Sequence, residues 1–112
     1  MKKNLPKKKI YENFDKELKS LAKRHRSLLA DIAQLANNLL NNPQEGESLG
    51  RGCYKVRMAI TSKGKGKSGG ARIITCVKIE LDTLYMLTIY DKSDRENIST
   101  AELTELLNEI GV

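Results

Sequence analysis

Two segments of the chain, 53–60 and 71–79, have the spacing of β-strands, in which successive side chains point to opposite faces. One face of the first segment is apolar, and we predict that its residues pack in the core: Tyr54, Val56, Met58 and Ile60. The other face of that segment carries Lys55 and Arg57, and Arg72 occupies the matching face of the second segment. The pattern therefore predicts a pair of strands with cations on one side.

A third strand-like segment, 84–90, follows a turn at Asp82 and Thr83. The short connections between the three segments predict an antiparallel meander. Strand alternation assigns Tyr85, Leu87 and Ile89 to the core, and it assigns Met86, Thr88, Tyr90 and Lys92 to the face of the cations.

Apolar residues recur at helical spacing over 13–25 and 27–42, where Pro43 ends the second pattern. The two patterns together predict a helical hairpin. Segment 7–12 is predicted as a short first strand, and the turn-rich segment 43–52 is predicted as a connector.

The C-terminal helix has the clearest boundaries. Ser99 and Glu102 fit the S-x-x-E capping box, and Gly111 stands where a left-handed residue often ends a helix. The element order β-α-α-β-β-β-α predicts an α+β domain, in which an antiparallel sheet packs on an N-terminal helical hairpin beside a C-terminal helix. The length of 112 residues fits a single domain over 1–112, with a frayed start at 1–6.

Charge is concentrated in the connection between the first two strands of the meander. Six cations stand between Lys55 and Arg72 without a carboxylate among them. Residues 1–79 hold 18 Lys and Arg against 6 Asp and Glu, whereas 80–112 hold 2 against 8. A solvated face explains many charge runs, but cations on strands and on a hairpin tip together favour a polyanion, and nucleic acid is the natural partner. We expect three lysines of the connection to bind RNA: Lys63, Lys65 and Lys67.

Membrane and nucleotide-binding proteins are not indicated. No apolar run approaches the ~18 residues that a membrane span requires, and the basic N-terminal segment lacks the apolar stretch of a signal peptide. We therefore expect a cytoplasmic protein without membrane contact. The sequence Gly-Lys-Ser at 66–68 lacks the first glycine of a P-loop and precedes a strand, so no nucleotide cofactor is expected.

Metal binding is not indicated either. The two cysteines, Cys53 and Cys76, and the single His25 do not have the spacing of metal ligands. A register that places Arg57 opposite Arg72 also places the cysteines opposite each other, and we expect them to be thiols in a reducing cytosol. We expect His25 to face solvent between the two helices.

Three stretches resemble the RelE/HigB family, which are toxins of type II toxin–antitoxin modules within the RelE/ParE superfamily. They are GCYKVR at 52–57, KSGGARII at 67–74 and MLTIYDKSDRENIS at 86–99, and the resemblance extends over roughly 7–110. It implies an endoribonuclease, an mRNA interferase that cleaves mRNA during translation on the ribosome. It also implies a cognate antitoxin protein that neutralises the toxin.

The resemblance assigns the catalytic positions of the family to this chain. The strand cations of the pattern correspond to Lys55 and Arg57, the sheet arginine to Arg72, and the basic residue after the last strand to Lys92. The tyrosine that RelE members carry in the last helical region is absent. Ser99 stands nearby, and Tyr90 is the candidate replacement.

RNA cleavage by its own 2′-OH requires deprotonation of that hydroxyl, stabilisation of a charged phosphorane and protonation of the leaving 5′-oxygen. We predict Arg72 as the clamp on the phosphorane, because a guanidinium donates two parallel hydrogen bonds and stays charged. Arg57 and Lys55 are predicted to bind phosphate and transfer protons, with Tyr90 or Lys92 as an accessory. This chemistry needs neither a metal nor a cofactor.

Two alternatives remain open. The first is a ParE-like toxin that inhibits a protein target such as gyrase, because the same fold supports both functions. The second is an inactive, toxin-derived module that binds nucleic acid, and the absent tyrosine favours this second alternative.

Overall fold

The computed structural model describes residues 7–10, 12–78 and 82–111, and the predicted frayed start lies outside them. Its strands are β1 (Lys7–Ile10), β2 (Glu47–Gly50), β3 (Cys53–Met58), β4 (Ala71–Lys78) and β5 (Thr83–Asp91). Its α-helices are α1 (Glu12–Ala22), α2 (Leu28–Asn41) and α3 (Thr100–Glu109), and the β3–β4 connection contains two 3-10 turns, η1 (Thr61–Lys63) and η2 (Lys67–Gly69). The predicted α+β class is confirmed.

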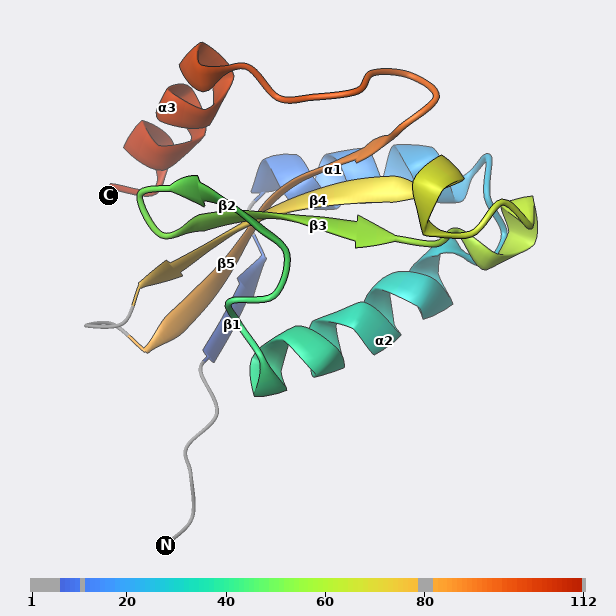
Figure 1. Cartoon of the computed structure of the whole chain (residues 1–112), viewed down its shortest axis with the longest axis horizontal. Coiled ribbons are helices and arrows are strands. Elements are labelled where there is room, and N and C mark those ends of the chain that lie inside the picture. Colours follow the sequence, from blue (N-terminus) through green and yellow to red (C-terminus); the bar gives the residue numbers. More distant parts are fainter. Residues whose placement is uncertain (1–6, 11, 79–81, 112) are drawn as a thin grey trace, which may run out of the picture.

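One sheet carries all the strands, in the order β1-β5-β4-β3-β2 (Figure 1). Strands β2 to β5 pair antiparallel, which confirms the predicted meander, whereas β1 pairs parallel with β5. The predicted register is also confirmed, because Arg57 lies opposite Arg72 and Cys53 lies opposite Cys76. Both cysteines are buried and free of disulfides.

Strand β2 lies within the segment that the sequence predicted as a connector, so that prediction is wrong. β2 pairs only with the first part of β3, from Glu47 opposite Lys55 to Gly50 opposite Cys53. Its side chains are exposed apart from the half-buried Leu49, so no alternation of apolar and polar residues marks it. An edge strand that buries so little leaves almost no signal in a sequence.

A first core fills the space between the sheet and the helical hairpin. Phe14 and Leu18 of α1 and the apolar stripe of α2 pack there against strand residues, with Leu28 and Leu39 fully buried. Three of the residues predicted to face inward join this core: Val56 and Met58 of β3, and Ile60 just after it. Tyr54 is only half-buried. Figure 1 shows α2 on one side of the sheet and α3 on the other.

A second core lies between the opposite face of the sheet and α3. It combines strand residues with three leucines of that helix: Cys53, Ile74, Cys76, Tyr85, Leu87, Tyr90, Leu103, Leu106 and Leu107. Both faces of the sheet are therefore buried over part of their area, although the sequence predicted only one core face.

The predicted face assignment along β5 is partly wrong. Met86 packs in the first core with Ile89, whereas Tyr85 and Leu87 pack in the second. The reason is an irregularity opposite β4, where Ile74 pairs with Thr88 and Thr75 pairs with Met86, so that Leu87 has no partner. Such a bulge reverses the alternation of a strand at one point. Tyr90 nevertheless lies on the predicted face.

Helix α3 begins and ends as predicted. The side chain of Ser99 accepts a hydrogen bond from the backbone N–H of Glu102 at 3.1 Å, which completes the N-terminal cap. Gly111 follows the helix with φ of +77°, a conformation that glycine adopts without strain. These caps fix the position of the helix that covers the second core.

Candidate functional site

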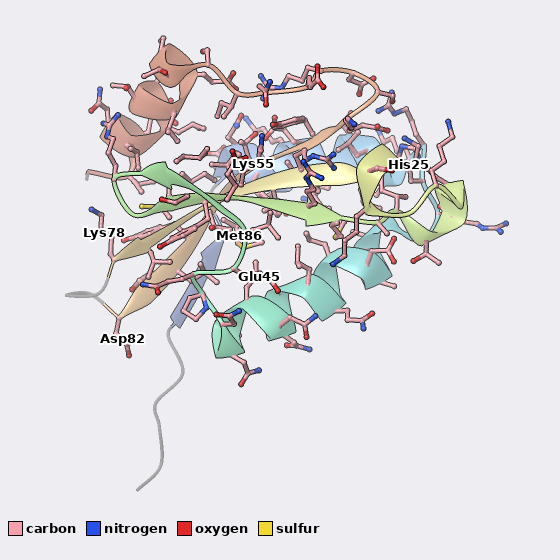
Figure 2. The ribbon with its side chains drawn as sticks, in the orientation of Figure 1. His25, Glu45, Lys55, Lys78, Asp82 and Met86 are labelled. Carbon is pink, nitrogen blue, oxygen red and sulfur yellow. The ribbon has the colours of Figure 1, made fainter. Side chains whose placement is uncertain are left out.

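The five residues predicted to be catalytic come together on the face of the sheet that α3 partly covers. Arg57, Arg72 and Tyr90 lie in one row across β3, β4 and β5. Lys55, labelled in Figure 2, precedes Arg57 by two positions on β3, so strand alternation places it on the same face. Lys92 lies in the turn directly after β5, next to the end of this row. The backbone N–H of Lys92 donates to the carbonyl of Gly70 at 3.0 Å, which fixes the end of this row.

The two cations of β3 differ in their surroundings. Arg57 is exposed and forms no ion pair or hydrogen bond through its guanidinium within the described part of the chain. The side chain of Lys55 is 15% exposed, and its Nζ lies 3.1 Å from Glu47 Oε2 and 3.0 Å from Asn97 Oδ1. The sequence suggested that Lys55 is surrounded by cations, but the structure places a carboxylate and an amide oxygen there.

Arg72 is buried, with 3% of its surface exposed. Its guanidinium donates to the carbonyl oxygens of Lys67 at 2.9 Å, Ala71 at 3.0 Å and Ser68 at 3.3 Å. These bonds hold the 61–70 connection against the start of β4. The role of Arg72 as a clamp on the transition state stays a prediction, because in this arrangement its donors bind the backbone.

Tyr90 is also buried, and its hydroxyl has no hydrogen-bond partner among the described residues. Burial raises the pKa of this hydroxyl, although the nearby charges of Arg95 and Arg72 oppose the shift. The guanidinium of Arg95 lies 4.4 Å from the centroid of the Tyr90 ring, a cation–π contact. Arg95 in turn binds both carboxylate oxygens of Glu102 in α3, at 2.6 and 2.9 Å.

Sequence reasoning did not single out Arg95. Its position in the KSDR stretch after β5 was the only available signal, because its contact with Tyr90 and its pairing with Glu102 depend on the tertiary fold. Arg95 links the segment after β5 to both the sheet and the helix.

The three lysines predicted to bind RNA separate into two kinds. Lys63 is largely buried and pairs with Asp91 at 2.9 Å. Lys65 and Lys67 are exposed and have no side-chain partner within the described residues. The connection turns closely over β3 at Gly70, where a Cβ atom would lie 2.0 Å from the carbonyl oxygen of Met58, so only glycine fits.

Asp91 joins three separate parts of the chain. Its carboxylate accepts hydrogen bonds from Lys63 Nζ at 2.9 Å, from the backbone N–H of Ser93 at 2.9 Å and from the Ser93 hydroxyl at 2.7 Å, and it lies 2.8 Å from His25 Nε2. Burial alone would raise the pKa of Asp91, but the hydrogen bonds from Lys63, Ser93 and His25 outweigh it and hold the pKa well below its ordinary value. His25 is therefore half-buried and bound, and the prediction of a solvent-facing side chain is wrong.

A groove of about 710 Å³ runs between α2 and the β2–β3 edge of the sheet. Three of the predicted cations line it: Lys55, Arg57 and Lys67. Apolar residues such as Leu35 and Met58 form part of its wall, and three carboxylates also line it: Asp31, Glu45 and Glu47. The groove therefore brings acidic and basic side chains together beside Arg57.

The described residues contain no group of three or more His, Cys, Asp or Glu side chains that could hold a metal ion. No helix among those same residues is both long enough and apolar enough to cross a membrane.

The model of the family described as "RelE toxin of RelE / RelB toxin-antitoxin system" matches residues 7–110 of the chain. The chain belongs to the RelE toxin family. This match covers nearly the whole chain, including every element of the fold, and it establishes a toxin of a toxin–antitoxin system.

Two solved structures are similar to this RelE-family chain. The first is the E. coli toxin RelE with two arginines replaced by alanine, in the free state; the TM-score is 0.62 at 16% sequence identity, and the match covers 96% of this chain and 99% of that one. The second is the toxin–antitoxin complex RelBE2 from Mycobacterium tuberculosis, with a TM-score of 0.57 at 17% identity, covering 79% of this chain and 99% of that one. At these identities the likeness concerns the fold.

Proposed function

We propose that this RelE-family toxin is an mRNA interferase that cuts translated mRNA on the ribosome, through attack of the RNA's own 2′-OH and without a metal ion. The observation that carries the proposal is Arg57. Its guanidinium is exposed, has no partner in the described structure, lies directly opposite Arg72 and lines a groove of about 710 Å³. A free guanidinium in this position suits a phosphate, because its planar fork donates two hydrogen bonds to two oxygens.

Each chemical step has a candidate side chain. Arg57 contacts the scissile phosphate and stabilises the charge that develops on it. Arg72 adds positive charge directly beside Arg57 and holds the connection that carries Lys65 and Lys67. Because the hydroxyl of Tyr90 lies in the core, we assign proton transfer to Lys55 and Lys92. One of them, as a neutral amine, takes the proton of the 2′-OH, and the other, as an ammonium, gives a proton to the leaving 5′-oxygen.

The free lysines of the connection extend the binding surface. Lys65 and Lys67 have no ion pair within the described residues, and Lys67 lines the same groove as Arg57. Each lysine that neutralises a phosphate adds affinity that weakens as salt rises. Lys63 contributes to this surface indirectly, because its ion pair with Asp91 fixes the start of the connection.

The proposal includes a cognate antitoxin and a cytoplasmic location, where ribosomes and mRNA are found. Support for the antitoxin comes from the family description, which names a toxin–antitoxin system, and from the similarity to a toxin solved in complex with its antitoxin.

The test is primer extension on a translated message after induced expression of the wild type and of Arg57→Ala. We expect cuts within the coding region that decrease at least 100-fold in the variant, since removing one donor to a developing oxyanion costs about 10²–10³ in rate. The cuts should also disappear when translation initiation is blocked. Arg51→Ala is the matched control, because it removes an exposed arginine whose side chain donates a hydrogen bond to the Thr104 hydroxyl of α3.

Other outcomes select the alternatives. Growth arrest with an uncut message would contradict the proposal and favour a protein target such as gyrase. Folded protein that causes neither arrest nor cutting would favour a module that only binds nucleic acid.

A further inference from the structure

The ammonium group of Lys55 is held by acceptors from two separate parts of the chain. Its Nζ lies 3.1 Å from Glu47 Oε2 and donates to Asn97 Oδ1 at 3.0 Å. Only 15% of this side chain is exposed. Arg57 and Lys67, which line the same groove, are exposed and have no side-chain partner within the described residues. The fold therefore fixes one cation of the groove and leaves these two free.

The edge strand β2 brings Glu47 to Lys55. The two residues are directly opposite each other in the β2–β3 ladder, where opposed side chains lie close enough to pair. Gly46, just before β2, passes so close to β3 that a Cβ atom there would lie 2.5 Å from the carbonyl oxygen of Lys55. Its φ of +105° also favours glycine. This close approach fixes the start of β2 and, with it, the position of Glu47.

Asn97 reaches Lys55 from the segment that joins β5 to α3, which runs over the α3 side of the sheet (Figure 1). Contacts with α3 hold this segment on both sides of Asn97. Arg95 binds both carboxylate oxygens of Glu102, and Ser99 accepts the capping hydrogen bond from the backbone N–H of Glu102. Because Asn97 lies between two anchored positions, its amide oxygen meets the ammonium at little further cost in conformational entropy.

These two partners determine which kind of proton transfer suits Lys55. A carboxylate and an amide oxygen both accept hydrogen bonds, and the carboxylate is negative, so together they favour the charged ammonium over the neutral amine. Only the neutral amine can take a proton. Lys55 is therefore suited to giving a proton, whereas Lys92 has no ion pair or side-chain hydrogen bond within the described residues that would hold it as an ammonium.

We propose that Glu47 and Asn97 are positioning residues that hold Lys55 as an ammonium beside the groove, so that Lys55 gives its proton to the leaving 5′-oxygen. The inference rests on the proposed function and decides which of the two lysines is the acid. Lys92, as a neutral amine, takes the 2′-OH proton while the 2′-oxygen bonds to phosphorus. The bond from phosphorus to the 5′-oxygen breaks, and Lys55 protonates that oxygen. The products are a cyclic phosphate and a free 5′-hydroxyl, and proton exchange with water restores both lysines.

The experiment compares two synthetic messages on programmed ribosomes, with either oxygen or sulfur as the bridging 5′ atom of the bond that the wild type cuts. Sulfur leaves as a thiolate without needing a proton, because thiols are much stronger acids than alcohols. Single-turnover rates and affinities are measured for Lys55→Ala, Lys92→Ala, Glu47→Gln and Asn97→Ala. The matched control is Glu12→Gln, which removes an exposed carboxylate that pairs with a lysine of α1.

On the oxygen message we expect Lys55→Ala to cut at least 100-fold more slowly, since a general acid contributes about 10²–10⁴ in rate. Glu47→Gln and Asn97→Ala should each lose roughly tenfold in the rate at saturation, as for a lost hydrogen bond to a charged group, with unchanged affinity. On the sulfur message these three variants should match the wild type. Lys92→Ala should lose cleavage on both messages, and the control should lose it on neither.

The contacts of Lys55 are measured separately, by the ¹⁵N NMR signal of its side-chain ammonium. Hydrogen bonds to Glu47 and Asn97 slow the exchange of the ammonium protons with water. The signal should therefore be resolved in the wild type and in Glu12→Gln, and it should broaden in Glu47→Gln and Asn97→Ala. This measurement does not depend on cleavage.

Two results would overturn the inference. Rates on the oxygen message that are equal in Glu47→Gln, Asn97→Ala and the control would show that neither residue positions Lys55. A loss in Lys55→Ala that persists on the sulfur message would show that Lys55 does not protonate the leaving oxygen. By contrast, a wild type that cuts neither message but keeps the resolved Lys55 signal would contradict the proposed ribonuclease and leave the contacts of Lys55 in place.

Discussion

The face of the sheet that α3 partly covers contains two regions with opposite character. Under α3, Cys53 is fully buried in the second core, whereas Arg57, four residues further along β3, is exposed and unpaired in the described structure. Helix α3 and its caps exclude water from the first region and do not bury the side chain of Arg57. One strand thus contributes to the core at its start and presents an exposed charge near its end.

A closer comparison separates two arginines that face each other across β3 and β4. The guanidinium of Arg72 donates three hydrogen bonds to backbone carbonyls, and Arg72 is only 3% exposed. The guanidinium of Arg57 has no hydrogen-bond or ion-pair partner in the described residues. Both arginines belong to the stretches that resemble the family, yet only Arg57 has an exposed side chain. The number of charges in a sequence is therefore a poor guide to the number of charges available for binding.

The largest expected effect is a loss of stability on disrupting the second core, which lies under α3. Leu107→Ala removes a side chain that is 1% exposed in the second core, and we expect a loss of about 3 kcal/mol in the free energy of unfolding, as for other buried leucines. Urea unfolding of the wild type and the variant measures this difference in the free energy of unfolding. The control Leu29→Ala changes a residue that is 57% exposed on α2 and should cost less than about 0.5 kcal/mol.

Cleavage by the folded fraction of Leu107→Ala should equal that of the wild type, because the residues to which we assign cleavage, Arg57, Lys55 and Lys92, do not belong to the second core. Reduced cutting by fully folded variant protein would show that the two regions are coupled, and it would contradict their separation.

Much of the fold was predictable because its signals are local. The strand alternation around Val56, the S-x-x-E cap at Ser99 and the position of Gly111 each depend on neighbours within a few residues, and all three were confirmed. The register considered from the sequence, with Arg57 opposite Arg72 and Cys53 opposite Cys76, is the one observed. The predicted catalytic residues accordingly fall on one face.

The errors concern features that depend on distant parts of the chain. The bulge at Leu87 and the edge strand β2 have no local pattern. The partners of Lys63 and His25 could not be predicted either, because Asp91 reaches them from 28 and 66 positions away in the sequence. A sequence shows where the charges are, but only the fold shows which of them are already neutralised.

A smaller loss of stability is expected from Asp91→Asn. This variant removes the carboxylate that contacts both Lys63 of the 61–70 connection and His25 between α1 and α2. We expect a loss of about 2 kcal/mol at pH 7, less than for a fully buried pair because Lys63 can turn toward solvent. The pKa of Asp91 is lowered on folding, so its contribution is complete above the unfolded value of about 4 and is lost as the pH falls toward the folded value. The difference between wild type and variant should therefore shrink below about pH 4.

The measurement is the unfolding midpoint of the wild type and of Asp91→Asn at a series of pH values from 2 to 7. Asp15→Asn serves as the control, since the Asp15 side chain is 48% exposed and its pair with Lys19 is a surface contact worth little. A stability difference that stays constant across the whole pH range would show that the charge of Asp91 does not contribute to stability.

The smallest effects come from Arg72→Lys and Arg57→Lys, and they decide which arginine contacts the phosphate. Lysine keeps the charge but cannot donate to three separate carbonyls, so Arg72→Lys should lower the free energy of unfolding by about 1 kcal/mol, whereas Arg57→Lys should leave it within about 0.5 kcal/mol.

Cleavage should respond in the opposite order. It should decrease roughly tenfold in Arg57→Lys, which loses a two-pronged contact with phosphate, and less in folded Arg72→Lys. If Arg72→Lys instead shows the larger loss of cleavage, the buried arginine must leave its carbonyls to bind the transition state, and the connection that it holds must move during the reaction.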